Sequence, residues 1–98
     1  MFARVINGIV QLGKIDELVS LVNDQIGPRV SQRSGSRGML LLIDEGTRHV
    51  ISISLWDSKE AMMDGETGTF LNDQLSQVLP LMEEAPSTRN FRVSARFE

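Results

Sequence analysis

Asn7 and Trp56 are the first candidates in the 98-residue chain for contact with a small ligand. Trp56 is the only tryptophan, and it stands where an alternating strand pattern stops and a helix-start pattern begins. Its indole either fills the core at the end of the strand or lines a cavity, where its N–H could donate to a ligand or to dioxygen. Asn7 is an amide inside an apolar strand, where it costs free energy unless a bulge or a bond to the backbone satisfies it.

The strand that ends at Trp56 carries three further polar candidates. Ser52 and Ser54 share a face with Trp56, and their hydroxyls could bind a ligand or lie in a subunit interface. His49 is the only histidine and stands at the start of this strand, where an exposed side chain is more common than an acid–base catalyst. Because the chain has no second histidine and no carboxylates at ligand spacing, we expect no metal site.

The composition indicates one globular domain, residues 1–98. The chain has no cysteine, which excludes disulfides and thiolate chemistry and is typical of a reducing cytoplasm. The formal charge is -3 and the arginines cluster only loosely, so we expect no nucleic-acid partner. No apolar run approaches the roughly 20 residues of a membrane span, and the first residues lack the pattern of a signal peptide. We therefore expect a cytoplasmic protein with no membrane partner.

The spacing of apolar residues predicts the first two elements. A strand covers residues 2–10, and a helix begins near Lys14, with apolar residues at the i, i+3, i+4, i+7 and i+11 positions of one face. Gly27 and Pro28 should end or kink this helix. A further turn through Arg33 is compatible with the sequence, because proline is well tolerated at a first helical position.

A hairpin and a short helix come next. The strands of the hairpin are residues 39–44 and 49–56, and a short turn joins them. Asp57 and Glu60 have the spacing of a capping box, which predicts the start of a helix. Gly65 should interrupt this helix.

The last part of the chain contains a longer helix and a strand. The helix covers residues 71–82, with a kink or a restart at Pro80. Strict alternation over residues 91–97 predicts a half-buried strand. The order β-α-β-β-α-β is the ferredoxin-like split βαβ arrangement, an α+β fold with a four-stranded antiparallel sheet and helices on one face.

Both faces of the predicted sheet carry apolar side chains, although two helices cover only one face. On the third strand, Ile51, Ile53 and Leu55 point one way, and Val50 and Trp56 point the other way. A contiguous exposed apolar patch usually marks an interface or a ligand site. We therefore predict a homodimer whose two sheets pack face to face, close a barrel-like space and bury on the order of 2,000 Å².

Several segments together resemble the antibiotic-biosynthesis-monooxygenase-like family of dimeric α/β-barrel proteins. They are "MFARV", the Gly13–Lys14 pair before a helix, "GMLLLID", "ISISLWDSKEAM" and the closing strand. The resemblance runs nearly from end to end, and the strand–Trp–Asp–Ser–helix segment is its most specific part. It implies a dimeric barrel with a mostly apolar cavity between helices and sheet in each subunit.

The resemblance also implies roles for particular residues. Trp56 and Asn7 become the catalytic candidates, because a tryptophan at this place is part of the pocket in characterised oxygenases of the family. A strand asparagine near position 7 contributes to the pocket of the haem-degrading members. The candidate ligand contacts are Ser52, Ser54 and Phe70.

Two features depart from the family. The haem-degrading members bind iron through a histidine, and alignment on Phe70 puts Gln74, a poor iron ligand, at that place. The quinone-forming members use tyrosines around the substrate, and this chain has no tyrosine. We therefore expect neither haem nor any other cofactor.

The resemblance implies a cofactor-independent monooxygenase that acts on a small aromatic or polyketide-like compound in an apolar cavity. Two alternatives stay open on the same fold. One is a non-catalytic binder of a small apolar ligand, and the other is a structural dimer whose cavity is filled by its own side chains. The missing tyrosine and the lack of a convincing general base favour these alternatives.

Overall fold

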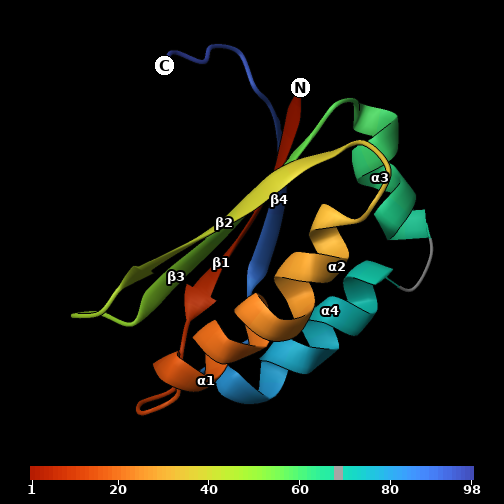
Figure 1. Cartoon of the computed structure of the whole chain (residues 1–98). Coiled ribbons are helices and arrows are strands. Elements are labelled where there is room, and N and C mark those ends of the chain that lie inside the picture. The colour runs from red at the N-terminus through yellow and green to blue at the C-terminus, as the bar shows by residue number, and fades with distance from the viewer. Residues whose placement is uncertain (68–69) are drawn as a thin grey trace.

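The chain forms a four-stranded antiparallel sheet with helices packed on one face, as Figure 1 shows. The structure is a computed structural model. It describes residues 1–67 and 70–98, and for residues 64–67 it describes the backbone alone. The strand order is β2-β3-β1-β4, so β1 and β3 are central. The fold is the predicted ferredoxin-like α+β arrangement. The element bounds are β1 Phe2–Ile9, α1 Ile15–Leu21, η1 Val22–Ile26, α2 Gly27–Ser31, β2 Ser36–Asp44, β3 His49–Trp56, α3 Lys59–Thr67, α4 Phe70–Val78, η2 Leu79–Leu81 and β4 Ser87–Arg92.

The hydrophobic core lies between the sheet and the helices. Leu18, Val22 and Ile26 recur every four residues and are at most 9% exposed, because this spacing places them on one helix face. Trp56 and Met62, each 1% exposed, are the largest fully buried side chains. Among the residues that the structure describes, no helix is both long enough and apolar enough to cross a membrane.

The first helix does not end at the Gly27–Pro28 pair, where the sequence predicted a break or a kink. It changes to a π-helical turn over Val22–Ile26 and then continues as α2. The N–H of Gly27 donates to the Val22 carbonyl five residues earlier. Pro28 lies in the first turn of the new α-helical segment, where proline is well tolerated. A Cβ at position 27 would lie 2.8 Å from the Val22 oxygen, so only glycine fits this turn without strain.

The start of α3 differs from the predicted capping box. The Ser58 hydroxyl accepts a hydrogen bond of 3.1 Å from the Ala61 N–H, so Ser58 caps the helix and Asp57 does not. The Asp57 carboxylate pairs instead with Arg37, across the end of the hairpin. The helix also continues past Gly65, at which we expected an interruption.

The last strand lies earlier in the chain than the alternation predicted. β4 covers Ser87–Arg92 instead of residues 91–97. The reason is the length of its partner, because Arg92 pairs with Phe2 at the beginning of β1. The Val93 N–H still donates to the Met1 carbonyl over 2.9 Å. Beyond that point the chain continues past the end of β1, and Phe97 is 94% exposed.

The strand register decides which side chains face the helices. Phe2 pairs with Trp56 and Ile6 pairs with Ser52, and these residues lie on the face that the helices cover. Asn7 pairs with Ile51, one residue further along, and therefore lies on the opposite face. Asn7 and Trp56, whose relative placement the sequence left open, are on different faces of the sheet.

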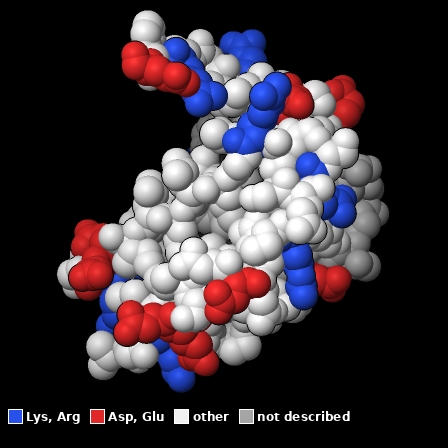
Figure 2. All heavy atoms as spheres, viewed as in Figure 1, with Lys and Arg blue, Asp and Glu red and all other residues white. Residues whose placement is uncertain are grey.

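The face opposite the helices also carries many apolar side chains, and we call it the outer face. Two of its leucines are strongly exposed, Leu40 at 55% and Leu42 at 47%. In Figure 2 the surface over β2 is uncharged, with charged side chains at its two ends. The apolar side chains of the outer face are Ala3, Val5, Ile9, Leu40, Leu42, Ile51, Ile53, Leu55 and Phe91.

Candidate functional site

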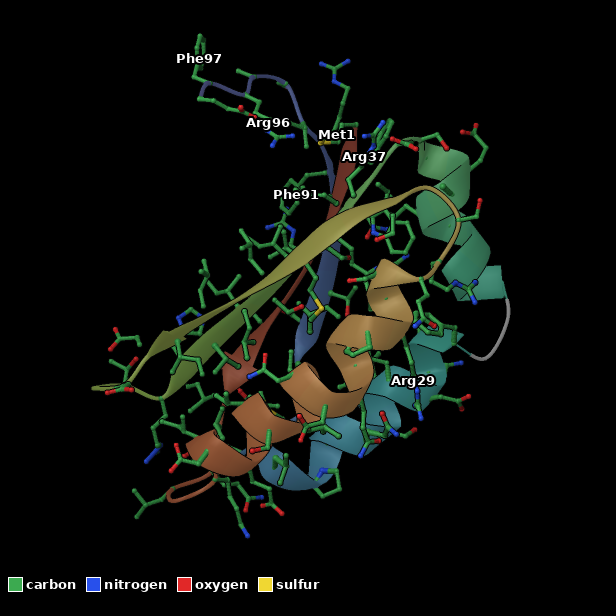
Figure 3. The ribbon with its side chains drawn as sticks, in the orientation of Figure 1. Met1, Arg29, Arg37, Phe91, Arg96 and Phe97 are labelled. Atoms are coloured by element: carbon green, nitrogen blue, oxygen red, sulfur yellow. The ribbon has the colours of Figure 1, made fainter. Side chains whose placement is uncertain are left out.

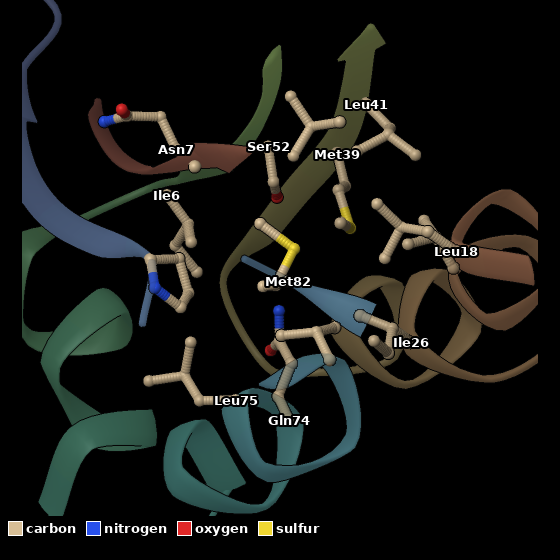
Figure 4. Close-up of a pocket in the computed structure, with 15 residues that line it drawn as sticks. Ile6, Asn7, Leu18, Ile26, Met39, Leu41, Ser52, Gln74, Leu75 and Met82 are labelled. Carbon is tan, nitrogen blue, oxygen red and sulfur yellow. The ribbon is translucent and has the colours of Figure 1, made fainter. Parts of the chain in front are cut away.

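An internal cavity lies between the sheet and the helices, and we call it the inner cavity (Figure 4). Strands β1, β2 and β3 form one side of it, and α1, η1 and α4 form the other. This is the place at which the family resemblance predicted a pocket. Most of its wall is apolar, with contributions from Leu18, Ile26, Met39, Leu41, Leu75 and Val78.

The inner cavity is narrow. About 40 Å³ of it is open to a water-sized molecule. This is room for a few waters at roughly 10–15 Å³ each, and it is far below the roughly 300–1,000 Å³ of a drug-sized ligand site. Met82 occupies part of the space, and its Cε would lie 2.7 Å from a Cβ at Gly8. Because methionine is unbranched and changes rotamer readily, Met39 and Met82 are the side chains that a larger ligand would displace.

Two polar side chains reach the inner cavity, from opposite walls. Ser52 lies on the β3 side and Gln74 on the α4 side, and Figure 4 shows both pointing toward Met82 in the middle. Among the described residues that line the inner cavity, none is ionisable. The cavity can therefore hydrogen-bond a ligand but has no acid or base of its own.

A second depression lies on the outside of the helix layer, between α2 and α4, and we call it the outer hollow. Ile26 and Gln74 line both the outer hollow and the inner cavity. Arg29 and Asp73 bring opposite charges to the outer hollow, and Figure 3 shows Arg29 on this side of the helices. Phe70, a predicted ligand contact, also lines the outer hollow and is not among the residues that line the inner cavity.

The Phe70 ring has a cationic neighbour. The Arg33 guanidinium carbon lies 4.4 Å from the ring centroid, which is the geometry of a cation–π contact. This contact joins the turn after α2 to the start of α4.

The Trp56 indole is inside the core, at the end of the sheet away from the inner cavity lining. Its Nε1–H donates to the Ser54 hydroxyl over 3.0 Å, and both side chains are buried. The two residues therefore satisfy each other, and the structure does not place either of them among the residues that line the inner cavity. Their predicted roles in catalysis and ligand binding stay predictions.

The Asn7 backbone borders the inner cavity, but its side chain turns to the outer face. Its Nδ2 donates to the Ser87 hydroxyl over 2.9 Å, which links β1 to β4. Figure 4 shows the Asn7 amide pointing away from the cavity. Of the five predicted site residues, Ser52 alone brings its polar side-chain atom into the inner cavity, and the catalytic role of Asn7 stays a prediction.

The only histidine is not among the residues that line the inner cavity. His49 is exposed at the start of β3 and lines an open depression on the outer face. Within the described part of the chain, no three histidine or acidic side chains gather in an arrangement that could hold a metal ion.

Gln74 is a polar residue of the inner cavity that the sequence did not lead us to predict as a ligand contact. The spacing contained a signal for it, because Leu71, Gln74, Leu75 and Val78 follow the i, i+3, i+4, i+7 positions of one helix face. An amide at an apolar position of such a face must meet either a partner or a pocket.

The comparisons with known proteins show the fold. No family model and no curated protein sequence matches the chain significantly. Two similar crystal structures carry the name "putative antibiotic biosynthesis monooxygenase". The one from Bordetella bronchiseptica has a TM-score of 0.79 at 16% identity, with 96% of this chain and 97% of the other covered. The one from Deinococcus radiodurans has a TM-score of 0.80 at 14% identity, with 100% and 97% covered.

A third similar structure is a conserved protein from Methanosarcina mazei. Its TM-score is 0.77 at 10% identity, with 93% of this chain and 90% of the other covered. The likeness extends over almost the whole of each chain, as the sequence resemblance did. The chain therefore has the fold of the antibiotic-biosynthesis-monooxygenase-like proteins.

Proposed function

We propose that the chain is a cofactor-independent monooxygenase that oxidises a small aromatic or polyketide-like compound in the inner cavity. One observation carries the proposal: an apolar cavity lies between sheet and helices, on a fold shared with proteins named for this activity. Reactive oxygen intermediates last longer in such a cavity, because apolar walls keep water away.

The reaction needs a substrate with an acidic CH₂ group, as in the keto tautomer of a single-ring phenol. Loss of a proton gives a carbanion, which passes one electron to dioxygen. The two radicals combine to form a C–O bond and hence a peroxide, which takes up a proton and loses water as its O–O bond and remaining C–H bond break. One oxygen atom ends in the new carbonyl and the other in water. The substrate supplies all four electrons, so the reaction needs no other reductant.

The described lining residues limit what the protein contributes to this reaction. None of them is ionisable, so the acceptor of the substrate proton is water. The Ser52 hydroxyl is the group on the sheet side that can bond a substrate oxygen. The contribution of the protein is then to orient the substrate and to exclude water.

We also propose that two copies of the chain pack their outer faces together. The sheet carries apolar side chains on both faces, whereas the uncovered face of a monomeric two-layer protein is polar. Arg4 and Ser54 are buried under the helices at 3% and 6% exposure, while Leu40 and Leu42 face solvent. A second copy would cover the outer face with a surface of the same chemistry, as a two-fold symmetric interface requires.

The second candidate function is a non-catalytic binder of a small apolar ligand on the same dimeric fold. The absence of tyrosine and of ionisable groups in the described cavity lining favours it, because neither a general base nor a phenol is there to assist oxidation. Both candidates use the same cavity, and they differ in whether dioxygen is consumed.

Oxygen uptake tests the proposal. The purified protein, freed of flavin and treated with a metal chelator, is mixed with anthrones, quinols and related phenols in an oxygen electrode. We expect protein-dependent uptake of one dioxygen for each carbonyl formed, unchanged by the chelator. Uptake no faster than without protein, for every compound in the panel, would reject the oxygenase in favour of the binder.

A further inference from the structure

The inner cavity and the outer hollow meet at two residues. Ile26 from the π-helical turn and Gln74 from α4 line both spaces. The outer hollow is the wider of the two, with about 230 Å³ open to a water-sized molecule against about 40 Å³ in the inner cavity. A molecule that moves from solvent through the outer hollow to the inner cavity would therefore pass Gln74.

A second amide lies one helical turn further along α4. Gln77 also lines the outer hollow, and residues three apart on a helix are neighbours, with roughly 5–6 Å between Cβ atoms. Its Oε1 is buried and finds no hydrogen-bond partner among the described residues. Such an acceptor costs free energy unless a donor reaches it. A ligand hydroxyl at the junction of the two spaces could supply that donor and accept from the Gln74 amide.

The charges around the two spaces favour a neutral ligand. The described lining of the inner cavity holds no ionisable side chain, so an ion would lose its hydration there without gaining a counter-ion. At the outer hollow Arg29 and Asp73 have opposite charges, so neither sign of ligand is strongly attracted. The chemistry of the site thus requires a neutral molecule with an apolar body and one hydrogen-bonding group.

We propose that the inner cavity binds a neutral, single-ring phenol that enters through the outer hollow, with its hydroxyl held between Gln74 and Gln77. The ring lies among the apolar side chains, where Met82 and Met39 move aside to admit it. Because the free space is small, one ring is the upper limit of size. This inference rests on the proposed function for the location of the site and not for the oxygen chemistry.

The first test measures binding to the unaltered protein by NMR, with ¹³C-labelled methionine methyl groups as probes. Phenol, toluene, benzoate and 2-naphthol are titrated separately at neutral pH. We expect phenol to shift the Met39 and Met82 methyl signals and to bind about tenfold more tightly than toluene, which lacks the hydroxyl. Benzoate, an anion, and 2-naphthol, with two rings, should give no saturable shift.

The second test uses substitutions on α4. Gln74→Leu should weaken phenol about tenfold and leave toluene unchanged, because only the hydroxyl loses a partner. Asn72→Leu, the same kind of change at an exposed position of α4, is the matched control and should leave both ligands unchanged. Gln77→Leu should weaken phenol but keep the fold, because the atom it removes has no partner among the described residues.

Several results would overturn the inference. One is that benzoate or 2-naphthol binds as tightly as phenol. Another is that phenol at millimolar concentration shifts no methionine methyl signal. A third is that phenol binds both glutamine variants with the same affinity as the control variant. Phenol binding without any oxygen uptake would support the inference and count against the oxygenase. Oxygen uptake with anthrones but no phenol binding would support the oxygenase and count against the inference. The two proposals can therefore fail separately.

Discussion

At the scale of single residues, Trp56 and Ser54 are a mutually satisfied pair in the core. Trp56→Phe removes the indole N–H and leaves the buried Ser54 hydroxyl without its donor, so we expect a loss of about 1–2 kcal/mol in the free energy of unfolding. Urea denaturation followed by circular dichroism measures this loss. Ser54→Ala should cost a similar amount, and the double variant should cost less than the sum of the two.

The same variant separates the two interpretations of Trp56. If the indole is structural, oxygen uptake or ligand affinity per folded molecule is unchanged in Trp56→Phe. If uptake disappears while the unfolding free energy stays that of the parent, Trp56 acts on the substrate as the family resemblance implies.

For Asn7, the question is whether its amide contacts the ligand or only links strands on the outer face. Because its amide bonds Ser87 and points away from the inner cavity, we expect Asn7→Ala and Ser87→Ala to have the same small effect on phenol affinity, within about twofold. NMR titration of both variants checks this. A loss of affinity confined to Asn7→Ala would show that the amide reaches the ligand.

At the scale of elements, the π-helical turn depends on Gly27. Gly27→Ala should destabilise the protein by about 1–3 kcal/mol, because the new Cβ would lie 2.8 Å from the Val22 carbonyl oxygen. Urea denaturation measures the effect, and Gly46→Ala in the β2–β3 turn is the control, since its Cβ would lie 3.4 Å from the nearest atom. Equal stability of the two variants would contradict the tight turn.

The periodicity of the sequence predicted the order and type of the elements, because burial of one face determines which residues are apolar. It did not predict their ends. β4 ends where β1 has no further residues to pair with, and Ser58 takes the cap that the spacing assigned to Asp57. Both outcomes depend on contacts between distant segments, which local patterns do not contain.

The candidate site was predictable in part for a similar reason. Alternation groups the residues of β3 and of β1 by face, but it does not say which face of β1 matches which face of β3. The pairing of Ile6 with Ser52 decides this and puts Asn7 on the face opposite to Ser52. Gln74 was detectable as an amide among apolar positions of a helix. The sequence could not show that Gln74 faces Ser52 across the inner cavity, because this depends on how α4 packs on the sheet.

At the scale of the whole molecule, the apolar outer face is the surface on which we propose that a second copy packs. Ile53 lies near its centre, because it pairs with Val5 on one side and Leu40 on the other. Ile53→Arg should raise the dissociation constant of the dimer roughly 100-fold, because it buries an unpaired charge between the two sheets. Sedimentation equilibrium measures the constant.

Leu12→Arg is the matched control for this substitution. Leu12 is 82% exposed in the turn after β1, so its replacement should leave the dimer unchanged. If both variants weaken the dimer equally, or neither does, the interface lies elsewhere.

The molar mass in solution shows whether this sheet, with helices on only one face, covers its apolar outer face with a second copy. Light scattering coupled to size-exclusion chromatography, at micromolar concentration, should give about twice the 10.9 kDa of one chain. A folded protein that elutes with the mass of a single chain at every concentration tested would contradict the account.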